Sequence, residues 1–302
     1  MIEENNKPEN VDLWRYVERH KQSIENALRQ FLPLAPPQIE TKFNEAVQYA
    51  LFSGGKRLRP VLTLLGAELF GAKAEMILPS AVAVEFIHTS SLVFDDLPCM
   101  DNSSERRGKT SLHEKYGEGL AVLVAIGFLN ASYALVFGNH KHLPENAIRA
   151  HAEIVECVGA SGMVGGQSVD LAIAKGAGGF SKGSYQLETV KNLKTSALMR
   201  LALRVGAILA GADSEKLGHL SRFAALLGDA YQLSDDLIDL REDDKIFNGT
   251  KTFAINQGQS AARFQLKTLI EQAKSVLIEN FADSEARICL LQLADYLAER
   301  KS

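Results

Sequence analysis

Carboxylates are concentrated on one face of a predicted helix at residues 229–240. The polar side chains there recur at i, i+3, i+4 and i+7, and they are Gln232, Asp235, Asp236 and Asp239. This spacing places them on a single stripe, where like charges repel, whereas hard oxygen ligands suit a magnesium ion that bridges to substrate phosphates. A solvated acidic face is the alternative. The apolar residues around the stripe favour a helix within a bundle, and therefore favour the metal site.

Another acidic segment, the first of the two in chain order, has the sequence DDLPCMD and supplies Asp95, Asp96 and Asp101. Pro98 within it cannot donate a helical hydrogen bond, so we expect the preceding helix to end or distort at this point. The distortion would let Asp101 fold back toward the other two aspartates.

Basic side chains surround this first acidic segment. His88 lies seven residues before Asp95, on about the same helix face, and Arg106 and Arg107 follow the segment. Arginine binds phosphate oxygens through two donors at once, while aspartates hold the metal that neutralises the remaining charge. The combination indicates a clamp for a metal-bound diphosphate. A helix end with internal salt bridges is the alternative.

Two further basic elements could contact phosphate. The heptapeptide GGKRLRP at residues 54–60 has paired glycines, which permit close backbone approach to an anion, followed by Lys56, Arg57 and Arg59. It lacks the GxxxxGK[ST] pattern of a nucleotide-binding loop. The other element, Lys194 with Thr195, offers an ammonium and a hydroxyl group. These two residues alone do not indicate a phosphate site.

The chemistry left open to these residues is metal-assisted departure of a diphosphate. The sequence has no catalytic serine or cysteine motif, and its seven histidines form no HExxH pair. When magnesium and several cations hold a diphosphate, electrostatic stabilisation makes that group a good leaving group.

Composition excludes several classes of protein. A net charge of −4 and a pI near 6.0 provide no basic field, so nucleic acid is not an expected partner. The three cysteines are far apart, which fits a reducing compartment, and we expect a cytoplasmic protein. No secretory signal is visible at the start, where we expect residues 1–10 to be disordered.

The helices that must position these residues are predicted to form one large all-α bundle, a single domain covering residues 1–302. Helical periodicity dominates, and neither Pro33 nor the glycine-rich loop at residues 176–183 resembles a domain boundary. Residues 119–138 contain no charge, but polar interruptions and the lack of a second comparable run favour a buried helix over a membrane span.

Taken together, the motifs resemble those of the trans-isoprenyl diphosphate synthases, the short-chain prenyltransferases that make farnesyl and geranylgeranyl diphosphate. GGKRLRP, DDLPCMD with RRGK, GMVGGQSVDL, LKTSAL and LGDAYQLSDDLID occur in the family's order and approximate spacing over nearly the whole chain. The resemblance implies an all-α fold, usually a homodimer, with the two aspartate motifs facing each other across a central cavity.

The resemblance also implies a role for each matching residue. Magnesium, three ions per site, is expected on Asp95, Asp96, Asp101, Asp235 and Asp239. The positions that match allylic-diphosphate ligands are Arg106, Lys194, Thr195 and Gln232, and those that match isopentenyl-diphosphate ligands are Lys56, Arg59, His88 and Arg107. The residues expected to act at the reacting bond are Asp95, Asp96, Lys194 and Asp235. In this family the allylic diphosphate ionises, the double bond of isopentenyl diphosphate attacks the carbocation, and a proton is lost.

Product length and catalytic competence depend on departures from the family pattern. Ser90 stands where an aromatic residue usually stops growth at fifteen carbons, so we expect geranylgeranyl diphosphate rather than farnesyl diphosphate. Phe128 replaces a frequent aspartate. The loop after Asp239 is short, and Lys245 and Lys251 are the candidates for a lysine that contacts the allylic diphosphate. A weakly active or non-catalytic subunit and a terpene cyclase therefore remain alternatives.

Overall fold

The computed structural model describes residues 11–138, 144–174, 196–242 and 258–300. The helices are α1 (Leu13–Gln30), α2 (Phe43–Phe52), α3 (Leu58–Glu68), α4 (Ala74–Asp95), α5 (Leu112–Tyr116), α6 (Glu118–Phe137), α7 (Pro144–Val158), α8 (Met163–Ala174), α10 (Ala197–Leu209), α11 (Ser214–Glu242), α13 (Gln259–Asn280) and α14 (Glu285–Glu299). The two-residue strands β1 (Glu105–Arg106) and β2 (Lys109–Thr110) form an antiparallel hairpin. The prediction of an all-α protein is confirmed.

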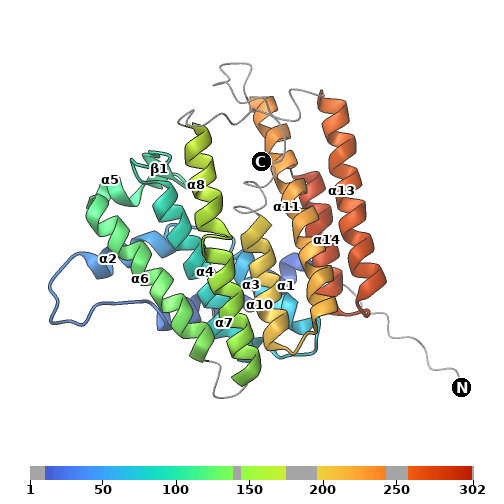
Figure 1. Ribbon diagram of the computed structural model, residues 1–302, viewed down its shortest axis with the longest axis horizontal. Coiled ribbons are helices and arrows are strands. Elements are labelled where there is room, and N and C mark those ends of the chain that lie inside the picture. The colour runs from blue at the N-terminus through green and yellow to red at the C-terminus, as the bar shows by residue number, and fades with distance from the viewer. Residues whose placement is uncertain (1–10, 139–143, 175–195, 243–257, 301–302) are drawn as a thin grey trace, which may run out of the picture.

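Helices α3, α4 and α10 form the middle of the bundle. Figure 1 shows α6 on one side of them and α13 on the other, with α7 and α11 in between. Helix α4 packs against α3 and α6, while α10 packs against α3 and α7. Their apolar residues point in all directions because each helix is covered on most sides, as expected of helices at the centre of a bundle.

Two glycines allow α3 and α10 to approach each other backbone to backbone. A Cβ atom at Gly66 would collide with the carbonyl oxygen of Leu203, and one at Gly206 would collide with that of Thr63. Each helix therefore leaves a gap where the other helix's main chain passes. The close approach fixes the position of α3, whose first three residues are the last three of GGKRLRP.

Helix α4 ends where the sequence predicted. Its last residue is Asp95, and the chain then turns back so that the amide of Asp101 donates to the carbonyl of Asp95 at 3.0 Å. Pro98, which has no amide hydrogen, lies in the turn between them. The expected folding back of Asp101 is confirmed for its main chain.

Helix α6 differs from its prediction as a buried helix. It covers the uncharged run, but only 33% of its most apolar window is buried. Ala121, Val124 and Phe128 face the bundle. By contrast, Leu123 is 56% exposed and Ile126 is 50% exposed. Its apolar residues surround the whole helix, and a single copy of the chain covers only one face.

The sequence prediction also overlooked a second apolar helix. By length and composition, both α4 and α6 could cross a membrane, and the corresponding window of α4 is 72% buried. Burial of that extent is what the core helix of a bundle shows.

Candidate active site

A cavity of about 630 Å³ opens beside the end of α4. Its wall is mostly apolar and comes from α4, α6, α7, α8 and α10, through Ile87, Leu92, Phe94, Leu129, Val158, Met163, Leu171 and Leu198. Its polar lining includes Arg59, His88, Asp95 and Gln167. Such a cavity suits a ligand with a long apolar tail and a strongly polar end.

The two neighbouring aspartates of the first acidic segment face different surroundings. Asp95 lines the cavity. Asp96 is 3% exposed and accepts a hydrogen bond at 2.9 Å from Nε of Arg106, which also pairs with it through a terminal nitrogen. The proximity of Asp96 raises the pKa of the Arg106 guanidinium. Arg106 stands on β1, so this pair ties the hairpin to the end of α4.

Two residues of the predicted isopentenyl-diphosphate set, Arg59 and Arg107, lie close to a third, His88, whereas Lys56 does not. Nη2 of Arg107 lies 3.3 Å from Nε2 of His88, and another nitrogen of Arg107 donates to the carbonyl of Gly54. The guanidinium occupies the space that a Cβ atom at Gly55 would fill. One of the paired glycines therefore makes room for an arginine of the same protein.

Burial and neighbouring charges determine the state of His88. Burial, together with the positive charges of Arg59 and Arg107, holds the pKa of His88 well below its usual range, so the ring is neutral. Because a guanidinium only donates, Nε2 must accept from Arg107, and the ring proton resides on Nδ1. Burial likewise lowers the pKa of Arg59.

Three polar atoms of residues that line the cavity are buried without a hydrogen-bond partner among the described residues. They are Nε of Arg59, Nδ1 of His88 and Oε1 of Gln167. Buried donors without acceptors cost free energy, on the order of 1–3 kcal/mol each. Two such donors belong to residues that line one cavity, and an anion or another strong acceptor at that place would be favoured.

The three cations of GGKRLRP have separate surroundings. Arg57, with a left-handed φ of 53°, is buried and pairs with Glu25 at 2.8 Å and with Glu85 at 2.9 Å. Lys56 is exposed, and its Nζ donates to the hydroxyl of Tyr296 at 2.8 Å. Only Arg59 of the three lines the cavity. Arg57 is therefore a structural ion-pair partner between α1, α4 and the start of α3.

The second acidic segment lies in the last turns of α11. Gln232 and Asp235 are half-buried there, and Asp235 forms an ion pair with Arg300, just beyond the end of α14. Tyr231, one helix turn before Asp235, is close enough to Arg59 to influence its pKa. The residues predicted to bind isopentenyl diphosphate and those of the second acidic segment therefore lie at the same end of the bundle.

Several predicted site residues fall outside what the structure describes. They are Lys194, Thr195, Lys245 and Lys251, together with the side chains of Asp236 and Asp239. Within the described residues, no group of three acidic, histidine or cysteine side chains is placed to hold a metal ion.

Sequence reasoning gave no role to Gln167, Tyr296 or Arg300. Gln167 belongs to the quoted segment GMVGGQSVDL, and its Nε2 lies 3.8 Å from the sulfur of Met100 in the first acidic segment. The motif was the available signal for Gln167. For the other two, at the end of the last helix, the sequence offered none.

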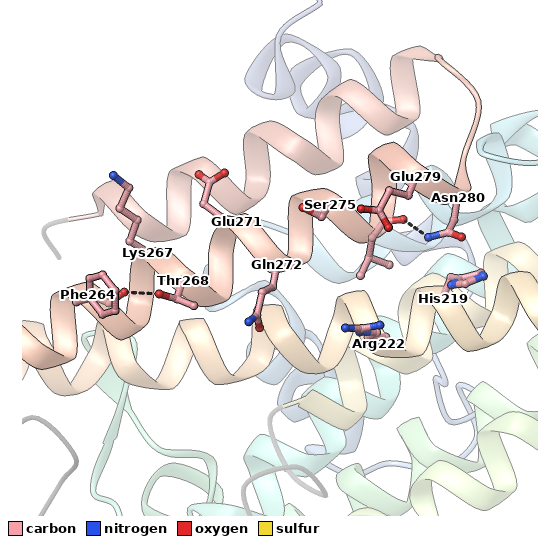
Figure 2. A pocket seen from close by; sticks show the side chains of 11 residues that line it. His219, Arg222, Phe264, Lys267, Thr268, Glu271, Gln272, Ser275, Glu279 and Asn280 are labelled. Atoms are coloured by element: carbon pink, nitrogen blue, oxygen red, sulfur yellow. Dashed lines mark hydrogen bonds between the residues drawn. The ribbon is translucent and has the colours of Figure 1, made fainter.

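A groove on the outside of the bundle, also of about 630 Å³, contains none of these residues. Figure 2 shows it between α11, which carries His219 and Arg222, and α13, which carries Phe264, Lys267 and Glu271. Acidic and basic side chains alternate along it, and they give it no single chemical character.

The fold and the cavity define a class of protein: an all-α bundle that binds a molecule with a long apolar tail and an anionic end. The comparisons with known proteins agree. The model of the polyprenyl synthetase family matches residues 40–251. The chain therefore belongs to the polyprenyl synthetase family, as the sequence motifs predicted.

Relatives extend the similarity over the whole chain. The geranylgeranyl diphosphate synthase of Cyanophora paradoxa is 34% identical over 97% of this chain and 98% of its own. The large subunit 1 of a heterodimeric geranylgeranyl pyrophosphate synthase of Arabidopsis thaliana is 33% identical over 98% of this chain and 81% of its own. An apo crystal structure of an FPP/GFPP synthase from Zymomonas mobilis superimposes with a TM-score of 0.83, at 31% identity, over 95% of this chain and 99% of that one.

Proposed function

We propose that this protein is a short-chain prenyltransferase that condenses isopentenyl diphosphate with allylic diphosphates. The observation that carries the proposal is the apolar cavity whose polar lining combines Asp95 with the unpartnered buried donors of Arg59 and His88. An apolar cavity alone would suit many lipids. The combination with a carboxylate and anion-binding donors suits a prenyl diphosphate.

We propose that the carboxylates of the two acidic segments bind a divalent cation, magnesium, with three ions per site. Carboxylates are the ligands that magnesium prefers, and the chemistry of this donor set therefore fits the ion; the residues are Asp95, Asp96, Asp101, Asp235 and Asp239. When bound, magnesium neutralises the charge that develops on the departing allylic diphosphate. Both acidic segments serve this one leaving group.

The protein's own side chains divide the two diphosphates between them. Arg59, His88 and Arg107 form a positively charged, metal-free subsite for isopentenyl diphosphate, with Lys56 at its exposed edge. Neutral His88 donates from Nδ1 without adding charge. The apolar wall excludes water from the allylic carbocation, which would otherwise be hydrolysed. The Arg106–Asp96 pair holds the hairpin against the end of α4.

We propose geranylgeranyl diphosphate as the product. Ser90 lines the cavity, and its hydroxyl donates to the carbonyl of Ala125 at 2.9 Å, so the side chain is held against α6. The names of two relatives agree with this length. Purified protein should be incubated with dimethylallyl and isopentenyl diphosphates, and the hydrolysed products chromatographed. We expect geranylgeraniol, and farnesol as the sole product would contradict the proposal.

We also propose that the protein is a cytoplasmic homodimer of single-domain chains, joined through α6 and α7. The exposed apolar residues of these two helices include Leu123, Ile126 and Phe137 on α6 and Ile148 and Val155 on α7. Large apolar side chains exposed on two helices that pack together are typical of an interaction surface. We expect a mass of twice 33.0 kDa by light scattering. The double substitution Leu123→Asp with Ile126→Asp should halve it, whereas Phe264→Asp, on the outer groove, should not.

The non-catalytic alternative makes the opposite prediction for the isolated protein. A true synthase releases diphosphate on its own when magnesium is present, and the Asp95→Ala variant does not. If the wild-type protein alone releases no diphosphate above the level of that variant, the proposed activity is wrong.

A further inference from the structure

The end of the last helix reaches the second acidic segment. Helix α14 ends at Glu299, and the next residue, Arg300, leaves the helix in an extended conformation with φ −60° and ψ 142°. Its guanidinium contacts Oδ1 of Asp235, a residue 65 positions earlier in the chain. Nothing in the local sequence of either helix indicates this contact.

Arg300 is held in place independently of Asp235. Its Nε donates to the hydroxyl of Ser234 at 2.9 Å, and its Nη2 lies 3.4 Å from the carbonyl oxygen of Tyr231. The guanidinium lies over the ring of Tyr231, 4.1 Å from the centroid. The Arg300 side chain is only 9% exposed. A planar, permanently charged group with this many partners is a fixed component of the site.

The helix that carries Arg300 is itself anchored along its length. Ser284 caps its start by accepting from the amide of Arg287 at 3.1 Å. Gln292, in its middle, bonds to main-chain atoms of Val11 and Leu13 at 2.8 and 2.6 Å. The position of the guanidinium over α11 therefore follows from the packing of the whole bundle.

The contact engages one oxygen of the Asp235 carboxylate and leaves the group 46% exposed. A carboxylate on a helix surface samples several rotamers, and a hydrogen bond from a fixed donor restricts them. Groups that hydrogen-bond to a metal ligand typically orient it, and their loss weakens metal affinity by roughly 10–100-fold. The remaining oxygen can then face the metal.

We propose that Arg300 is a positioning residue that orients the Asp235 carboxylate toward the metal-bound allylic diphosphate. The inference rests on the proposed function, because it assigns Asp235 to that leaving group. It adds to the site a residue that directly follows α14. Arg300 acts through Asp235 and makes no contact with the reacting atoms.

The test measures binding of inorganic diphosphate by calorimetry, at limiting and at excess magnesium, with no turnover. For Arg300→Gln we expect the dissociation constant of diphosphate to rise about 10–100-fold at limiting magnesium, with much of the loss recovered at excess magnesium. Arg300→Lys keeps the charge but cannot reproduce the planar fork, and we expect a smaller loss. The concentration of magnesium that gives half-maximal turnover should rise in the same order.

The control is Arg19→Met. Arg19 also pairs with a carboxylate of α14, Glu285, at 2.7 Å, but at the opposite end of that helix and in an exposed position. This variant should bind diphosphate as the wild-type protein does. Unfolding temperatures of all variants are measured alongside, and if Arg300→Gln does not fold, the comparison of Arg300→Lys with the wild type decides.

Two results would overturn the inference. Unchanged or tighter binding in the variants would mean that Arg300 does not orient the metal ligand, or that it competes with the metal. A loss that excess magnesium does not recover would mean that Arg300 binds the anion directly. If the wild-type protein itself binds no diphosphate with magnesium, it is the proposed function that fails.

Discussion

The two acidic segments are held in place by different means. In the first, Asp96 pairs with Arg106, ten residues away on the adjoining hairpin, and its neighbour Asp95 lines the cavity. In the second, Asp235 pairs with Arg300, which comes from the end of another helix. The first segment is organised locally, whereas the second depends on the packing of the whole bundle. We therefore expect substitutions in the two segments to divide their effects differently between catalytic activity and folding stability.

Asp95→Ala should have the largest effect on activity. The side chain lines the cavity and is only half-buried, so we expect its loss to disturb the folded state less than the loss of the fully buried Asp96. Removal of a group that stabilises developing charge typically lowers kcat by about 10²–10³-fold. Steady-state release of diphosphate measures the loss, and thermal unfolding should change little. A fall in stability as large as that of Asp96→Ala would contradict the assignment of separate roles.

Asp96→Ala should reduce stability as well as activity. The carboxylate is 3% exposed and accepts hydrogen bonds from Arg106, so the substitution removes charged hydrogen bonds from a buried position. Because Arg106 is itself 38% exposed, water compensates some of the loss, and we expect the unfolding free energy to fall by about 1–3 kcal/mol. Urea titration measures this. Glu18→Ala, which removes an exposed ion pair with Lys21, is the control and should cost less than about 1 kcal/mol.

Tyr296→Phe tests the metal-free side of the site. It removes the acceptor of the Lys56 ammonium but keeps the ring, over which Nζ lies 5.3 Å from the centroid. Loss of one such hydrogen bond corresponds to about 0.5–1.5 kcal/mol, or a rise of about 2–10-fold in the KM for isopentenyl diphosphate. The KM for the allylic substrate should not change. Tyr116→Phe, which removes a similar bond to Glu45 at 2.8 Å, should change neither.

The local features of the site could be predicted from the sequence. Pro98 ends α4, Asp101 folds back, and Arg59, His88 and Asp95 meet at one cavity. The end of α4 and the fold-back follow from a residue that cannot continue a helix, and the shared face of His88 and Asp95 follows from helix periodicity. Arg59 was placed with them only by the resemblance to the family. The bundle of helices follows from the same periodicity.

Pairings between distant segments could not be predicted in the same way. The sequence gives the same weight to all cations of GGKRLRP, yet Arg57 is buried between Glu25 and Glu85. Likewise, Asp95 and Asp96 are alike in sequence, and only packing decides which of them meets Arg106. The apolar surface of α6 is visible in the sequence, but the sequence does not tell which face of the helix the same chain covers.

The smallest expected effect is a change in folding stability with pH. It tests the surroundings of His88, near the first acidic segment, where several arginines lie close to the ring. Burial and nearby arginines lower the pKa of His88 in the folded protein, whereas the unfolded chain protonates it at about 6.5. Below that pH the unfolded state binds a proton that the folded state does not bind, so stability decreases as the pH falls.

His88→Gln removes the contribution of this histidine to the pH dependence of stability. The difference in unfolding free energy between wild type and variant should be constant above about pH 7.5 and should shift in favour of the variant between about pH 6.5 and 5. His219→Gln, at a histidine on the outer groove, serves as the control. A wild-type and His88→Gln pair whose difference does not vary with pH would show that folding does not shift the pKa of His88, and the neutral ring assigned to the folded protein would then be wrong.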